Sequence, residues 1–119
     1  MKLLAYEVDK RSFLGVLNED ETWVYPISAA GMEYRSMKDL IREAGPSEME
    51  MLDYISKKMP GDVTGAASVE EIKVVSPIAE PDQDIICLGI NYMDHAKESA
   101  RFKKEEFSKP EKAIYFSKR

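Results

Sequence analysis

Cysteine and histidine are almost missing from this sequence of 119 residues, which contains one of each. The single cysteine, Cys87, cannot form an internal disulfide, and its place in the apolar stretch DIICLGI predicts a small buried side chain. The lack of disulfides favours a reducing, cytoplasmic location. One histidine and one thiol also fall short of the three or four ligands that a zinc site requires.

Long apolar stretches and an excess of positive charge are missing as well. The N-terminal segment MKLLAYEVD is interrupted by Glu7 and Asp9 before the core of a signal peptide or a membrane span could form, so we expect no membrane segment. Lysine and arginine number 17 against 22 aspartates and glutamates, which gives a net charge of -5. No basic cluster is available to neutralise phosphates, so nucleic acid is not expected as a partner.

The sequence also lacks the glycine-rich and serine motifs of several enzyme classes. It contains no P-loop, no Gly-x-Gly-x-x-Gly and no Gly-x-Ser-x-Gly, which removes support for phosphate binding and for serine hydrolysis. The Glu-x-Glu pair of Glu48 and Glu50 lies in a helical pattern and is interpreted as surface rather than as a magnesium site.

Strand and helix patterns together indicate an α+β fold. Three stretches, KLLAYEV, SFLGVLN and ETWVYPI, are rich in aliphatic and aromatic residues and are separated by short polar turns, which predicts a three-stranded antiparallel meander. Two helical patterns follow. The first has Ser36 as its N-cap and Gly45 as its stop, and the second has Ser47 at its start and Pro60-Gly61 at its end.

Helical spacing predicts which residues of these two segments face the core. We expect both helices to pack on the meander and to bury their apolar residues. The methionines among them are interpreted as core filler rather than as part of a cofactor site. The predicted core positions are Met37, Leu40, Ile41 and Ala44 in the first helix and Met51, Leu52, Ile55 and Met59 in the second.

The proline-containing segment at 76–83 predicts a boundary between two domains. Residues 1–75 would form the small α+β domain, and residues 84–119 would begin a second domain with two strands and a short helix from about Tyr92 to Ala100. The last strand needs a neighbour and a cover on its apolar face. We therefore expect that another chain supplies them, or that these residues are the front part of a longer protein.

The only histidine, His95, lies near the start of the helix predicted in the second domain. Asn91 is a suitable N-cap, and Glu98 follows His95 at i+3, on the same face of the helix. A carboxylate beside an imidazole fixes the tautomer and leaves the far nitrogen free to take a proton. The alternative is a solvent-exposed histidine with an incidental partner, and spacing alone favours that alternative.

Lys118 is a second candidate, at the end of the aromatic-rich strand AIYFSK. A lysine at a strand end can bind the carboxylate of a substrate, or it can simply be solvated. The sequence pattern leaves both interpretations open.

The segment DIICLGINYMDHAKES resembles the opening signature of the fumarylacetoacetate hydrolase family, in which an apolar strand leads into Gly-x-Asn-Tyr-x-x-His-x-x-Glu. The strand AIYFSK is similar to the family's next strand, which ends in aromatic-x-lysine, although the proline common after that lysine is Arg119 here. The meander and helices resemble the N-terminal domain of bacterial members. The matching residues of the signature are Gly89, Asn91, Tyr92, His95 and Glu98.

This resemblance implies a metal-dependent enzyme. Family members act on small 2-oxo acids, such as acylpyruvates or hydroxydiene-dioates, by hydrolysis, isomerisation or decarboxylation. They bind Mg²⁺, Mn²⁺ or Ca²⁺ through acidic residues of a mixed β-roll domain, of which residues 84–119 would be the first strands and the lid helix. Those acidic residues would lie beyond Arg119, so the chain alone is expected to be inactive.

The resemblance also implies residue roles and partners. His95 would be the base on the lid and Glu98 its orienting residue, with Lys118 and Tyr92 binding the substrate and Gly89 and Asn91 shaping the motif. The expected partners are a 2-oxo dicarboxylic acid, the missing C-terminal catalytic half and a second copy in a homodimer. The alternative is a non-catalytic assembly or interaction module.

Overall fold

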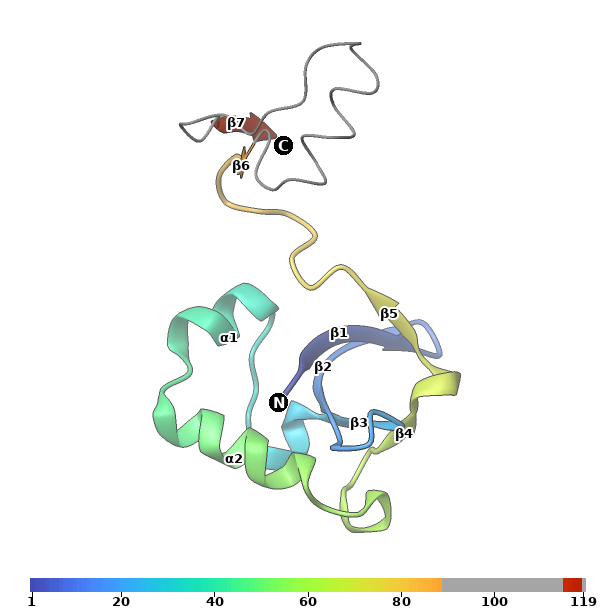
Figure 1. Ribbon diagram of the computed structural model, residues 1–119. Coiled ribbons are helices and arrows are strands. Elements are labelled where there is room, and N and C mark those ends of the chain that lie inside the picture. The colour runs from blue at the N-terminus through green and yellow to red at the C-terminus, as the bar shows by residue number, and fades with distance from the viewer. Residues whose placement is uncertain (89–114, 119) are drawn as a thin grey trace, which may run out of the picture. The chain divides into compact units, whose positions relative to one another are not determined.

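The computed structural model describes residues 1–88 and 115–118. The chain separates into two units, Met1–Ala79 and Glu80–Arg119, and each is described by itself. The first unit contains most of the regular structure (Figure 1). Its strands are β1 (Leu3–Val8), β2 (Arg11–Leu17), β3 (Trp23–Pro26), β4 (Ala67–Ser68) and β5 (Lys73–Val75), and its helices are η1 (Ile27–Ala30), α1 (Met37–Glu43), α2 (Pro46–Ser56), η2 (Pro60–Asp62) and η3 (Val69–Glu71).

The predicted meander is confirmed in β1, β2 and β3, which pair in antiparallel order. Val8 lies opposite Arg11, so only Asp9 and Lys10 form the first turn. Both have positive φ angles, 50° and 66°. This is the backbone of a type I′ turn, whose twist matches that of the flanking strands and fixes their register.

Strands β4 and β5 extend the meander to five strands in the order β4-β3-β2-β1-β5. The outer strands of a flat sheet of this size would lie roughly 19 Å apart. Residues 69–72, which join β4 to β5, could span roughly 18 Å if fully extended, but most of them form η3. The sheet therefore has to curl so that its two edges approach each other, and Figure 1 shows it curved.

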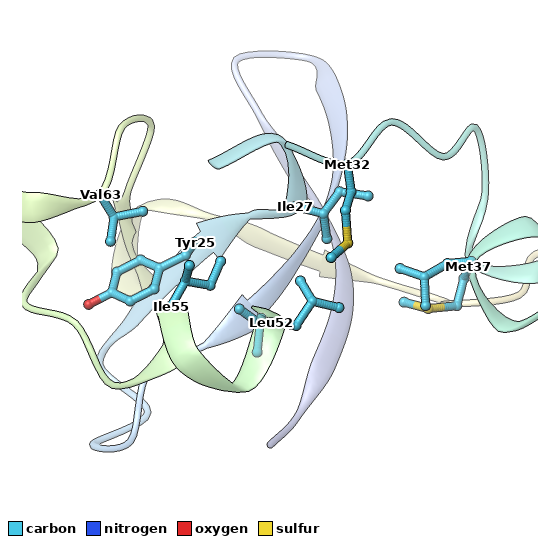
Figure 2. Close-up of a cluster of buried hydrophobic side chains, with 9 residues drawn as sticks. Tyr25, Ile27, Met32, Met37, Leu52, Ile55 and Val63 are labelled. Carbon is cyan, nitrogen blue, oxygen red and sulfur yellow. The ribbon is translucent and has the colours of Figure 1, made fainter. Parts of the chain in front are cut away.

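Both faces of the curled sheet are buried. Alternate residues such as Val16 and Tyr25 belong to one cluster, together with Leu52 and Ile55 of α2 (Figure 2). The residues between them face the other way and form a second cluster, in which the sheet's own edge segments supply the cover. The second cluster consists of Leu4, Tyr6 and Val24, with Ala67 and Ile72 among the residues packed against them.

Helix α1 begins as predicted, because the Ser36 hydroxyl accepts a hydrogen bond from the backbone N–H of Asp39 at 3.2 Å. Its predicted end is wrong by one residue. Ala44 already leaves the helix with an extended backbone, ψ 126°, and Gly45 is not a stop but the N-cap of α2.

Helix α2 differs from the prediction at both ends. It begins at Pro46 rather than after Ser47, since proline suits the first helical position and the Glu48 carboxylate accepts the N–H of Gly45 at 3.0 Å. It ends at Ser56, before the predicted Pro60-Gly61.

Three of the predicted core positions are wrong. Met37, Leu40, Leu52 and Ile55 are buried, but Ile41, Met51 and Met59 are 62%, 45% and 70% exposed. Neighbouring helical residues point about 100° apart, so Met51 cannot face the sheet when Leu52 does. Met59 lies beyond the end of α2 and follows no helical face.

The described residues of the second unit form two strands that match the predicted ones, β6 (Ile85–Leu88) and β7 (Tyr115–Lys118). They pair in antiparallel order, with Ile85 opposite Lys118 and Leu88 opposite Tyr115. Ile86 is 74% exposed and Ile85 is 49% exposed. A two-stranded sheet with exposed apolar residues is marginally stable by itself.

Candidate functional site

The histidine motif follows directly after strand β6. The structure describes this strand up to Leu88, which confirms the apolar strand that opens the motif. The motif residues themselves lie outside the described residues, so their helical spacing and their roles stay predictions. They are Gly89, Asn91, Tyr92, His95 and Glu98.

The pairing of β6 and β7 determines where Lys118 lies along the strands. Lys118 is opposite Ile85, at the beginning of β6, whereas the motif continues from the other end of β6, at Leu88. Three residue positions along a strand correspond to about 10 Å. The backbone of Tyr115, not that of Lys118, therefore lies opposite Leu88, the last residue before the motif. Sequence reasoning missed Tyr115, because the register of two strands that are far apart in the sequence carries no local signal.

Cys87 lies within β6, opposite Phe116. It is half-buried rather than fully buried as predicted, and its thiol lies 3.9 Å from the carbonyl oxygen of Ile85. The two-stranded sheet offers less cover than a complete core would, which explains the partial exposure.

In the first unit, the ionisable groups with shifted pKa values serve the fold. Burial raises the pKa of Tyr6 to about 12, and burial is also the main cause that raises the pKa of Tyr25. Hydrogen bonds, first from its own backbone N–H and then from Ser47 and Gly45, lower the pKa of the Glu48 carboxyl. Each shift holds the group in the charge state that it already has at neutral pH, so none of the three is prepared for proton transfer.

The chain was compared with known proteins. No family model matches it. Over 128 aligned residues it is 40% identical to the oxaloacetate tautomerase YisK of Bacillus subtilis (strain 168), in an alignment that covers 99% of the chain. The chain is homologous to the N-terminal part of a fumarylacetoacetate hydrolase family protein. The resemblance seen in the histidine motif is therefore confirmed, while the chain spans only 41% of the length of this relative.

The homology to a fumarylacetoacetate hydrolase family protein raises the question of a divalent metal. In the two described segments, no three histidine, cysteine, aspartate or glutamate side chains are grouped so that they could hold a metal ion. The described residues thus do not form a metal site by themselves. Among the same residues, no helix is long and apolar enough to cross a bilayer.

Proposed function

We infer that this chain is the N-terminal part of a divalent-metal-dependent fumarylacetoacetate hydrolase family enzyme that converts a small 2-oxo acid. The proposed reaction is the keto–enol tautomerisation of oxaloacetate, with hydrolysis or decarboxylation of a related 2-oxo acid as the alternatives. The observation that carries this proposal is the match of 99% of the chain to an oxaloacetate tautomerase. The complete signature from Gly89 to Glu98 supports it.

In this proposal His95 is the base. Tautomerisation moves one proton from the carbon next to the carbonyl to the carbonyl oxygen, and the electron pair of the C–H bond becomes the C=C bond of the enol. The imidazole removes that proton, and the Glu98 carboxylate holds the imidazole in the required tautomer. Tyr92 and Lys118 bind the substrate, and Gly89 and Asn91 shape the turn that leads out of β6.

The proposal includes further polypeptide. The exposed apolar residues of β6, above all Ile86, would be covered by the segment that corresponds to the remaining length of the relative. That segment would also supply the acidic ligands for Mg²⁺, Mn²⁺ or Ca²⁺, and the assembled enzyme would be a homodimer.

A chimera tests this function. The chain replaces the matching N-terminal part of the Bacillus subtilis tautomerase, and conversion of oxaloacetate between its tautomers is followed by ultraviolet absorbance with Mg²⁺ present. We expect activity in the chimera and a loss of about 100-fold or more in kcat for His95→Ala, the range typical of a lost general base.

The neighbouring Lys97→Ala substitution is the matched control and should leave kcat within about twofold of the chimera. Full turnover by a folded His95→Ala chimera would show that His95 is not the base. A folded dimeric chimera that is inactive with oxaloacetate and with acylpyruvates would instead favour an assembly module.

A further inference from the structure

A cleft opens on the first unit between the β1–β2 hairpin and residues 64–67. Its volume is about 700 Å³. Small-molecule sites typically measure roughly 300–1,000 Å³. The cleft lies on the sheet face that carries Tyr6, which is the face opposite to the one that packs against α2. It is lined entirely by residues of the first unit.

Two aromatic rings form one wall of this cleft. Tyr6 and Phe13 are opposite each other in the β1–β2 pairing, and their rings stack with centroids 5.5 Å apart and planes inclined by 24°. Tyr6 is 2% exposed, but Phe13 is 37% exposed. The Phe13 ring is thus supported from one side and is accessible to a ligand from the cleft.

A glycine makes this arrangement possible. A Cβ atom on Gly15, two residues after Phe13, would lie 2.8 Å from Cε1 of Tyr6 and 2.6 Å from the carbonyl oxygen of Tyr25. Both separations are shorter than van der Waals contact, so any other residue would displace the Tyr6 ring that supports Phe13.

The charges in the lining are mixed. Arg11 is two residues before Phe13 in β2 and lies opposite Val8. Asp9 belongs to the turn of the β1–β2 hairpin, and Glu71 belongs to η3. In the described part of the chain, none of these three charged side chains takes part in an ion pair. One cation and two carboxylates beside an exposed ring favour a ligand that carries a carboxylate, an ammonium group and an apolar ring.

We propose that this cleft binds a small aromatic zwitterion, an α-amino acid of the phenylalanine class. Its ring stacks on Phe13, its carboxylate binds the guanidinium of Arg11, and its ammonium group is held between the carboxylates of Asp9 and Glu71. The lining of this site shares no residue with the proposed 2-oxo acid site, and the proposal does not rest on that site.

Titration of the 119-residue chain with three probes tests the proposal. L-phenylalanine carries both charges, 3-phenylpropionate lacks the ammonium group, and phenethylamine lacks the carboxylate. We expect saturable amide shifts in ¹⁵N-labelled protein at Phe13, Gly65 and Ala66, with L-phenylalanine binding most tightly. The absence of saturable shifts at these positions with L-phenylalanine would overturn the proposal.

Substitutions then separate the two charges. Arg11→Gln should weaken L-phenylalanine and 3-phenylpropionate about tenfold, since a charge-assisted hydrogen bond is lost, and should leave phenethylamine unchanged. Glu71→Gln should weaken L-phenylalanine and phenethylamine only. Lys10→Gln and Glu70→Gln change the same charges at adjacent residues outside the lining and should have no effect. Equal losses in these controls, or equal affinity for all three probes, would refute specific recognition of a zwitterion.

Discussion

The hydroxyl of Tyr25 donates a hydrogen bond of 2.6 Å to the backbone carbonyl of Lys58, 33 residues further along the chain. Tyr25 is completely buried in β3, and Figure 2 shows its ring beside Ile55 of α2. The bond joins the segment that follows α2 to the sheet. It therefore holds the backbone at Lys58 in place against β3.

Replacement of this hydroxyl should be costly. We expect Tyr25→Phe to lower the free energy of unfolding by about 1–2 kcal/mol, because the Lys58 carbonyl loses a buried partner. Urea unfolding followed by circular dichroism measures the change. Tyr54→Phe, at a residue that is 60% exposed, is the matched control and should stay within about 0.5 kcal/mol. Equal stability of the two variants would show that the Tyr25 bond adds nothing.

Asn18 organises the turn between β2 and β3. Its side-chain oxygen accepts the backbone N–H groups of Thr22 at 2.9 Å and Trp23 at 3.1 Å. We expect Asn18→Ala to destabilise the chain by about 2 kcal/mol, since two backbone donors lose their partner. Thermal unfolding tests this, with the exposed Asp20→Ala in the same turn as control. A melting temperature that is the same for both variants would contradict the assigned role.

Gly15 is the glycine whose substitution the packing forbids. Gly15→Ala would place a methyl group against the Tyr25 carbonyl and the Tyr6 ring, so we expect a loss of about 1–3 kcal/mol from overpacking. Gly61→Ala is the control, because a Cβ there meets nothing within 4 Å. Denaturant midpoints of the two variants give the comparison, and a Gly15→Ala midpoint at the wild-type value would disprove the close approach.

Alkaline pH should weaken the fold through Tyr6. Its pKa is raised from 10.0 to about 12 by burial, so the folded state holds the proton more tightly than the unfolded state. The resulting contribution is fully present below pH 10 and is lost as the pH rises towards 12, and two pKa units correspond to about 3 kcal/mol. Unfolding free energies measured from pH 9 to 12 should fall less steeply in Tyr6→Phe. Identical slopes in the two proteins would exclude Tyr6 as a cause.

The sequence predicted the elements whose patterns are local. The alternation in the first 26 residues specified β1, β2 and β3, and the Ser36 cap specified the start of α1. Strand β4 was not predicted, because Ala67 and Ser68 carry no strand pattern and pair only where the chain returns to β3. Met51 and Met59 were assigned to the core because helical spacing alone cannot say where a helix ends or which stripe meets the sheet.

For the candidate site, the sequence indicates the histidine motif, and the structure adds the register of β6 and β7. The signature around His95 was found from its spacing, and homology over the chain confirms the family that it indicated. The pairing of Leu88 with Tyr115 could not be predicted, since the register of two strands far apart in the sequence carries no local signal. Lys118 stays a predicted substrate ligand, with its backbone at the other end of that pairing.

Residues 69–72 lead the chain back to β1, and this determines the order in which the strands can pair during synthesis. Strand β1 is synthesised before β5, its outer neighbour, whose residues leave the ribosome about seventy positions later. The hairpin of β1 and β2 is local and can form early, whereas one edge of β1 stays without hydrogen-bond partners until Lys73–Val75 arrive. Pairing across so long a sequence separation is slow to form. Strand β1 therefore needs protection from aggregation until β5 has been synthesised.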